Sequence, residues 1–208
     1  MSNDSPREYR SPVRKEQAAA TKQRILDAGR ELFLARGFDG TTIEAIAKQA
    51  GVAAPTVYAT LGSKSGIVAE LLNRARFGEG HRELVGKALA ETDARARLGL
   101  IAEIARRVYD GERAEMDLVR SVSGVSAELA EMERQHETAR FENQSAMVDL
   151  LVTSPDRKPD LDVDTIRDVL WALTGRDSYR MLVIKRGWPS DRYATWLGEL
   201  LVCALLKP

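Results

Sequence analysis

Residues 42–64 read TIEAIAKQAGVAAPTVYATLGSK, and this stretch decides how the chain folds. Apolar residues recur at intervals of three and four over two short segments, 43–50 and 55–61, which predicts two short helices. Gly51 lies between them, where a tight turn needs a positive φ that glycine adopts at little cost. Ala47, four residues earlier, is small where the two helices would cross closely. The spacing is therefore that of a helix-turn-helix motif.

The second of these helices has an outward face without acidic residues. Val57 and Leu61 belong to the shared core, and Pro55 in the first turn costs no hydrogen bond. The residues left facing outward are Ala54, Pro55, Thr56, Tyr58, Ala59 and Thr60. A solvated helix usually carries acids, whereas a carboxylate in a DNA groove would repel the phosphates. We therefore predict that this helix binds in the major groove, with an ordinary packed helix pair as the alternative.

Outside this stretch, almost all of the chain is also predicted to be helical. Residues 1–17 alternate charges with serine and proline, which indicates a flexible polar arm. A first helix is expected over 18–36, and a fourth helix from Ser63 to Arg76. Residues 77–80, FGEG, form the expected boundary with the rest of the chain. The predicted domains are the polar arm over 1–17, a helix-turn-helix domain over 18–76 and a helical body over 77–208.

The body is predicted to contain five further helices. Their expected ranges are 92–110, 115–122, 126–152, 162–186 and 190–206, with Asp162 or Asp164 as the cap of the fourth. No stretch alternates Val, Ile and Thr over the length of a strand. The predicted fold class is thus all-α, with about nine helices arranged as a three-helix helix-turn-helix head and a larger C-terminal body.

Composition indicates an ordinary globular protein with a modest charge asymmetry. Of 208 residues, 44% are hydrophobic and 30% are charged, and 31 basic side chains balance 31 acidic ones. Residues 1–76 nevertheless carry 12 basic and 8 acidic side chains, which suits a head that faces phosphates. The single Cys203 excludes an internal disulfide and fits a reducing compartment. Since there is no signal peptide and no strongly apolar run longer than 200–206, a cytoplasmic location is expected.

The last two helices are apolar over a wider stripe than the core of one monomer needs. A second copy of the chain is the simplest cover for such helices, and a dimer would present two recognition helices to a palindrome. The predicted dimer-interface residues are Leu182, Tyr193, Trp196, Leu197, Leu200 and Leu201. The alternative is that these side chains form a buried monomeric core.

The helix over 126–152 suggests a binding site in the body. His136 and Asn143 are polar residues on its otherwise apolar inward line. Burying them without partners would cost roughly 1–3 kcal/mol each, so a protein group, a water or a ligand must satisfy them. In the ligand interpretation, the residues lining a pocket would be Met116, His136, Asn143, Met147, Trp171 and Tyr179.

The sequence contains no recognisable signature of an enzyme. The two histidines, His81 and His136, have no cysteine partners and no zinc-ligand spacing. The segment 78–80 lacks the third glycine of a dinucleotide-binding loop, and neither a nucleophile elbow nor a phosphate-binding loop occurs. We therefore predict no enzyme activity, no catalytic residues, no metal site and no cofactor. The main competing function is a dimeric small-molecule-binding or scaffold protein that has lost DNA binding, which acids on the outward face or loss of Gly51 would indicate.

Seven short segments occur in a characteristic order between Thr21 and Leu72. They are TKQRILDA (21–28), LF (32–33), RGF (36–38), TTIEAIA (41–47), AGV (50–52), TVY (56–58) and GSK (62–64). Together they resemble the DNA-binding domain of the TetR (tetracycline repressor-like) family. The resemblance implies a homodimeric transcription repressor that leaves a double-stranded DNA operator when a small-molecule effector binds the body. It also implies a set of contacts: phosphates from Thr42, Tyr58 and Lys64, bases from Ala54, Pro55, Thr56, Ala59 and Thr60, and dimerisation through the last two helices.

One departure from the family concerns how bases would be read. Members of the family often carry an aromatic pair after the recognition-helix tyrosine, whereas this chain has Ala59-Thr60-Leu61. The outward face contains no Arg, Asn or Gln able to form bidentate contacts with a base. We expect readout through thymine methyls, threonine hydroxyls and DNA shape, with Arg14 and Lys15 either adding contacts or belonging to a solvated arm.

Overall fold

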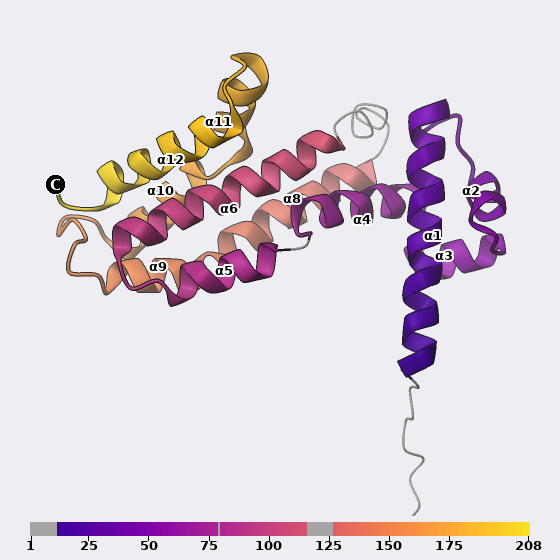
Figure 1. Cartoon of the computed structure of the whole chain (residues 1–208), viewed down its shortest axis with the longest axis horizontal. Helices are drawn as coiled ribbons and strands as arrows, with labels where there is room; N and C mark the ends of the chain where they lie inside the picture. The colour runs from indigo at the N-terminus through magenta and orange to yellow at the C-terminus, as the bar shows by residue number, and fades with distance from the viewer. Residues whose placement is uncertain (1–11, 79, 116–126) are drawn as a thin grey trace, which may run out of the picture. The chain divides into compact units, whose positions relative to one another are not determined.

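The computed structural model describes residues 12–78, 80–115 and 127–208 (Figure 1). All regular elements within these ranges are helices. The described residues form two compact units, one up to Leu71 and one from Leu72 onward. The prediction of an all-α chain with a helix-turn-helix head and a helical body is confirmed. The predicted boundary, after Arg76, lies slightly later than the division between the units.

The first unit, which we call the head, is built from helices that match the predicted ones closely. They are α1 (Pro12–Arg36), α2 (Ile43–Ala50), α3 (Ala54–Leu61) and the first part of α4 (Lys64–Arg76). Their shared core consists of fully buried apolar side chains, among them Ile25, Leu26, Phe33, Ile46, Val57 and Ile67. Gly29 of α1 allows close packing, since a Cβ there would lie 2.8 Å from a methyl carbon of Ile67.

The polar arm predicted over residues 1–17 is wrong for residues 12–17, which are the first residues of α1. Proline is compatible with the first turn of a helix, so Pro12 can open one. The residues that follow, RKEQAAA (14–20), are all strong helix formers. Polarity alone therefore indicated exposure correctly, because these side chains are exposed, but it was a poor guide to backbone structure.

Local signals in the sequence account for the ends of the head helices. Thr42 caps α2, its hydroxyl oxygen accepting a hydrogen bond from Ala45 N–H at 3.1 Å. Gly51 ends α2 with a φ of +66°, and Val52 N–H then donates to Ala47 O at 3.0 Å. Ser63 precedes α4, and its hydroxyl oxygen accepts a hydrogen bond from Gly66 N–H at 3.0 Å. These bonds satisfy backbone groups that helix ends leave unpaired.

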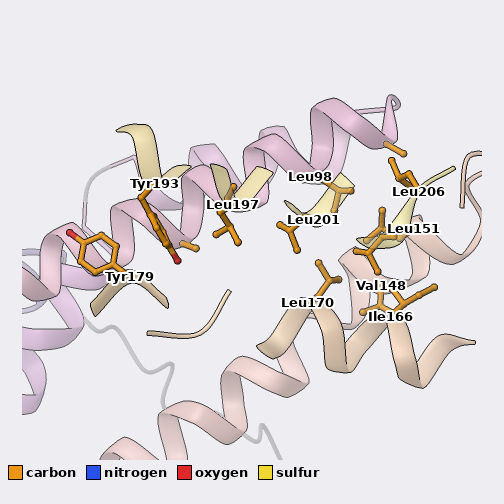
Figure 2. Packing of buried hydrophobic residues seen from close by; sticks show 14 of the residues in the cluster. Leu98, Val148, Leu151, Ile166, Leu170, Tyr179, Tyr193, Leu197, Leu201 and Leu206 are labelled. Atoms are coloured by element: carbon orange, nitrogen blue, oxygen red, sulfur yellow. The ribbon is translucent and has the colours of Figure 1, made fainter. Parts of the chain in front are cut away.

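The second unit, which we call the body, begins with the end of α4. Its further elements are α5 (His81–Ala90), α6 (Ala94–Ala114), α8 (Ala127–Asn143), α9 (Ser145–Val152), α10 (Val163–Leu173), α11 (Arg176–Tyr179), a π-helical segment (Arg180–Lys185) and α12 (Ser190–Leu205). Helices α6 and α12 pack along each other (Figure 1). Small residues permit this approach, since a Cβ at the buried Gly198 would lie 3.5 Å from Gly99 Cα. Side chains from α6, α9, α10 and α12 converge on one apolar core (Figure 2).

Three body elements differ from the sequence prediction. Helix α5 lies where no helix was expected, directly after the glycine-containing segment 77–80. The helix predicted over 126–152 is interrupted at Gln144, which separates α8 from α9. The helix predicted over 162–186 is interrupted at Thr174, whose hydroxyl donates to Leu170 O at 2.6 Å. Most of the helix predicted over 115–122 lies outside the described residues.

Candidate nucleic-acid interface and body cavity

Helix α3 presents the outward face that the sequence predicts. Val57 is buried in the head core, whereas Pro55, Tyr58 and Ala59 are exposed, Tyr58 by 52%. The residue that caps α3, Ala53, makes no side-chain hydrogen bond to the helix, and the first turn contains no acidic residue. Pro55 has no backbone N–H and Thr56 N–H donates to Ala53 O at 2.9 Å, so an anion at this helix end would be attracted mainly by the helix dipole.

The two threonines on α3 are not equivalent. Thr60 donates its hydroxyl proton to Thr56 O at 2.6 Å, so it can donate to a DNA base only by breaking this bond. No side-chain hydrogen bond involves the Thr56 hydroxyl in the described part of the chain, and Thr56 is half-buried. The methyl groups of the face, from alanine and threonine, therefore outnumber its available hydrogen-bond donors.

Thr42 is placed so that it can cap a helix and still donate a hydrogen bond. The residue is exposed, and its hydroxyl oxygen accepts from Ala45 N–H. Because the oxygen acts as an acceptor in the cap, its own proton remains available to a phosphate. The partial positive charge at the start of α2 would act on the same phosphate.

Lys64 has a structural role that sequence reasoning missed. Its ammonium donates to Phe38 O at 2.7 Å and to Thr41 O at 2.8 Å, and it lies 4.3 Å from the centre of the Phe38 ring. Two of its three N–H groups therefore hold the loop between α1 and α2. No local pattern could indicate these bonds, because their partners lie more than twenty residues away in sequence.

Other basic side chains surround the helix-turn-helix. Arg24 lies beside the turn, since a Cβ at Gly51 would be 3.7 Å from Arg24 Nη1. Arg14 and Lys15 are exposed on the first turns of α1, and Lys48 is exposed on α2. Arg24 was not among the predicted contact residues, although it belongs to the segment 21–28 that carries the family resemblance.

The body contains a partly open cavity of about 490 Å³, a size typical of sites for small molecules. Its walls come from the end of α4, from α5, α6, α8 and α9, and from the residue after α10. The lining residues are Asn73, Phe77, His81, Val85, Ile101, Ile104, Ala105, Val108, Tyr109, His136, Ala139, Arg140, Asn143, Gln144, Met147 and Thr174.

The predicted pocket residues are only partly brought together. His136, Asn143 and Met147 line the cavity, as their spacing along one helix line suggested. Trp171 and Tyr179 do not line it, so this part of the prediction is corrected. Trp171 lies on the outside of α10, where its ring packs against Phe141, and Tyr179 is buried in the body core against Tyr109 and Tyr193. Met116 lies outside the described residues.

Three rings form a row on one wall of the cavity. The Phe77 ring lies edge-on to His81 at 4.9 Å between centres, and it faces His136 at 5.7 Å. Burial lowers the pKa of His81, which favours its neutral form at pH 7. Phe77 and His81 were missed because the segment 77–80 was interpreted as a linker, although an aromatic residue beside glycines was a signal against that interpretation.

A polar network closes one end of the cavity. Arg140 donates to Glu137 Oε2 from Nε at 3.0 Å and from Nη2 at 2.8 Å, and its Nη1 donates to Trp171 O and to Thr174 Oγ1. Gln144 Nε2 also donates to Thr174 Oγ1, at 3.3 Å. The nearby His136 ring and the Arg140 guanidinium lower the pKa of Glu137 to about 2. Two buried atoms in this region, His136 Nδ1 and Gln144 Oε1, have no hydrogen-bond partner in the part of the chain that the structure describes.

A buried ion network lies beside the cavity. Glu112 of α6 pairs with Arg76 Nε at 2.5 Å and with Arg176 Nε at 2.7 Å. The side chains of Arg76 and Glu112 are only 5% and 11% exposed. Because buried charges are costly without partners, this network fixes the end of α4 to α6 and α11 within the body.

The predicted dimer interface is wrong for half of its residues. Tyr193, Leu197 and Leu201 are completely buried in the core of a single chain, where α12 packs on α6 and α10 (Figure 2). The alternative of a monomeric core holds for these three residues, because α6 and α10 of the same chain pack against α12. Leu182, Trp196 and Leu200 are only partly buried and remain candidates for the interface.

The described ranges, 12–78, 80–115 and 127–208, also bear on metal binding and membrane insertion. Within these ranges no three His, Cys, Asp or Glu side chains are grouped so that they could hold a metal ion. None of the described helices combines the length and the apolar character needed to cross a membrane.

Comparison with known proteins extends these observations. Residues 25–71 match the family described as "Bacterial regulatory proteins, tetR family". A search of curated protein sequences found no match. Among solved structures, NalD of Pseudomonas aeruginosa, the secondary repressor of the MexAB-OprM multidrug efflux pump, is 22% identical with a TM-score of 0.65. That match covers 90% of this chain and 98% of NalD.

A second similar structure is the transcriptional regulator FadR from Bacillus subtilis in complex with stearoyl-CoA. It is 20% identical with a TM-score of 0.64, and the match covers 88% of this chain and 98% of FadR. At such identities the structural likeness establishes the fold of the whole chain, while the match over residues 25–71 rests on the helix-turn-helix itself. Residues 25–71 thus carry the helix-turn-helix domain of the tetR family of bacterial regulatory proteins, and the fold of the whole chain is that of solved regulators of this kind.

Proposed function

We propose that this protein is a cytoplasmic transcription repressor that binds a palindromic operator as a homodimer and leaves it when a small molecule enters the body cavity. The observation that carries the proposal is the outward face of α3, which is exposed, free of acids and set on a firmly packed helix-turn-helix. A scaffold protein that had lost DNA binding would have no reason to keep this face free of carboxylates.

In this proposal the head divides its contacts between backbone and bases. Thr42, Tyr58 and the remaining N–H of Lys64 bind phosphates and set the register of the protein on the duplex. Five small residues read the major groove: Ala54, Pro55, Thr56, Ala59 and Thr60. Because most of them offer carbon atoms, thymine methyls and local DNA shape supply most of the sequence preference.

Dimerisation would place two copies of α3 about 34 Å apart, one helical turn of DNA, so that they meet successive major grooves. Partly exposed apolar side chains near the end of the chain support an interface there. Leu182, Trp196 and Leu200 are half-buried, and Met181 beside them is 55% exposed. A symmetric pair of these surfaces would cover all four residues.

Release by a small molecule requires that the cavity be linked to the head. Asn73 and Phe77 line the cavity at and just beyond the end of α4, and α4 begins at Lys64, which holds the loop before α2. NalD is a repressor and FadR was solved with stearoyl-CoA bound, so repression and ligand binding both occur on this fold. A coupling of 1–3 kcal/mol, typical of allosteric proteins, would weaken operator binding about 5- to 150-fold.

The direct test is selection of DNA from a library of random duplexes, followed by footprinting of the purified protein on the selected sequence. We expect a palindrome whose half-sites lie about 34 Å apart, with a mass in sedimentation analysis equal to that of two chains. If no duplex is retained over a polyanion competitor at low salt, the protein is instead a small-molecule-binding or scaffold protein that has lost DNA binding.

A further inference from the structure

The geometry points to an uncharged, mostly apolar aromatic molecule with one hydrogen-bond donor as the ligand of the body cavity. The inference rests on the proposed function only in taking this cavity as the ligand site. It assigns the ligand class from three properties of the walls, namely their shape, their charge and their unpaired polar atoms.

The shape of the walls suits a flat ring system. The row of Phe77, His81 and His136 forms one side, and Phe77 is 43% exposed although it is large and apolar. Branched aliphatic side chains of α6, including Ile101 and Ile104, supply the apolar part of the lining. Aromatic rings bind most favourably when they stack on other rings or pack edge-on against them. The row would therefore stabilise a bound aromatic ligand more than an aliphatic one.

The charge of the walls argues against an ionic ligand. Among the lining residues that the structure describes, Arg140 is the only one with a permanent charge, and it donates to Glu137, Trp171 O and Thr174. An anion would therefore have to break this network, and a cation would find no carboxylate among the described lining residues. Burial raises the pKa of Tyr109 and lowers that of His81, so both are neutral near pH 7.

The unpaired oxygen of Gln144 indicates a ligand that donates a hydrogen bond. Gln144 Oε1 is a buried acceptor without a partner among the described residues, while the amide nitrogen of the same side chain donates to Thr174 Oγ1. His136 Nδ1 is also buried without a partner among the described residues, and an imidazole nitrogen accepts or donates according to its tautomer, so it can pair with either kind of group. The last torsions of Gln and His side chains are soft, so small rotations would turn these atoms toward a donor in the cavity.

The inference is tested with two fluorescent probes that differ by a single charged group. N-phenyl-1-naphthylamine is neutral, aromatic and carries one N–H, and 8-anilinonaphthalene-1-sulfonate is the same scaffold with a sulfonate. We expect the neutral probe to bind the full-length protein once per chain, with a dissociation constant at least tenfold below that of the sulfonate, about 1.4 kcal/mol. Equal or tighter binding of the sulfonate would overturn the inference, as would displacement of the neutral probe by equimolar tetraphenylphosphonium.

Two substitutions and a matched control test whether the neutral probe binds in the cavity. Phe77→Ala should weaken binding of the neutral probe about three- to tenfold, the value of one aromatic contact. Leu89→Ala is the matched control, because Leu89 is a similarly exposed apolar residue of α5, 40% exposed, that does not line the cavity. Gln144→Leu, which removes the acceptor, should weaken the neutral probe but not its N-methylated analogue. If Phe77→Ala binds as the unmodified protein does, or Leu89→Ala loses as much affinity, the site is elsewhere and the inference is wrong.

These titrations contain no DNA, so they separate the inference from the proposed function. A protein that binds the neutral probe in the cavity but no duplex would overturn the repressor function and support the ligand class. A protein that binds an operator but prefers the sulfonate would support the repressor function and overturn the ligand class.

Discussion

The head and the body carry their functional residues in different ways. In the head, the residues proposed to meet DNA lie within 42–64, on two short helices and the start of a third. In the body, the cavity is assembled from side chains spread between Asn73 and Thr174, on at least five helices. A site built from one contiguous motif can be found from sequence spacing, whereas a site built across a helical bundle depends on packing that spacing does not specify.

The two regions also differ in how they treat charge. The outward face of α3 has no acidic residue, and exposed basic side chains such as Arg24 and Lys48 lie around the helix-turn-helix. In the body, charges near the cavity are matched, as in the pairs of Arg140 with Glu137 and of Arg76 with Glu112. The head is thus suited to a polyanion, and the body to a ligand without net charge.

The largest effect on operator affinity should come from placing a negative charge on the outward face of α3. Ala59→Glu puts a carboxylate against DNA phosphates, and like charges in contact cost several kcal/mol, so operator affinity should fall on the order of a thousandfold. Fluorescence anisotropy with labelled operator measures this. Ala90→Glu, at an exposed site at the end of α5, is the matched control and should bind normally. Binding of the neutral probe should be unchanged in both variants, and a loss there would mean that head and body are not separable.

The second largest effect concerns the ion network of the body. Glu112→Ala leaves the buried guanidinium of Arg76 without its carboxylate, and breaking such a pair costs about 3 kcal/mol of unfolding free energy. Urea unfolding followed by circular dichroism measures the change. Glu83→Ala serves as the control, because its ion pair with Lys87 is exposed at both ends and should matter little. An equal effect in the two variants would mean that burial of Arg76 does not govern the strength of the pair.

Lys64 is proposed to contact a DNA phosphate and also holds the loop between α1 and α2, so its replacement should change both DNA binding and stability. Removing a phosphate contact should lower the slope of log K against log salt by about 0.9 and weaken binding by roughly tenfold at low salt. Lys64→Ala also removes the bonds to Phe38 O and Thr41 O, so the melting temperature should fall as well. Lys87→Ala, on the body, should alter neither quantity. A lower melting temperature with an unchanged salt slope would leave Lys64 as a structural residue only.

What could be predicted from the sequence was decided by local chemistry. Thr42, Gly51 and Ser63 mark helix ends through caps and a positive φ, and the predicted ends of α2 and α3 agree with the structure to within a residue. These signals act over three or four residues, so they do not depend on the rest of the chain. The acid-free face followed directly, because two core positions on a short helix determine its outward side.

What could not be predicted depends on contacts distant in sequence. The interruption at Gln144 has no glycine or proline to mark it, and Phe77 beside two glycines resembled a linker. Tyr193, Leu197 and Leu201 had the spacing of an interface, but α6 and α10 of the same chain cover them. An apolar stripe predicts burial in each case, and it does not say whether the covering surface belongs to the same chain or to another.

The smallest expected effect tests whether the small residues of α3 recognise thymine methyl groups. Replacing thymine by deoxyuridine removes one methyl group and leaves every Watson–Crick group in place. Loss of one methyl contact is worth about 0.8 kcal/mol, so each contacted thymine should lower affinity about fourfold. Deoxyuridine placed outside the footprint is the control and should have no effect. The expected effect is small because the face reads bases by packing and not by bidentate hydrogen bonds, since Thr60 already donates its proton to Thr56 O. If no thymine in the operator is sensitive, the small residues of α3 do not read methyl groups, and DNA shape or the Thr56 hydroxyl must provide the preference.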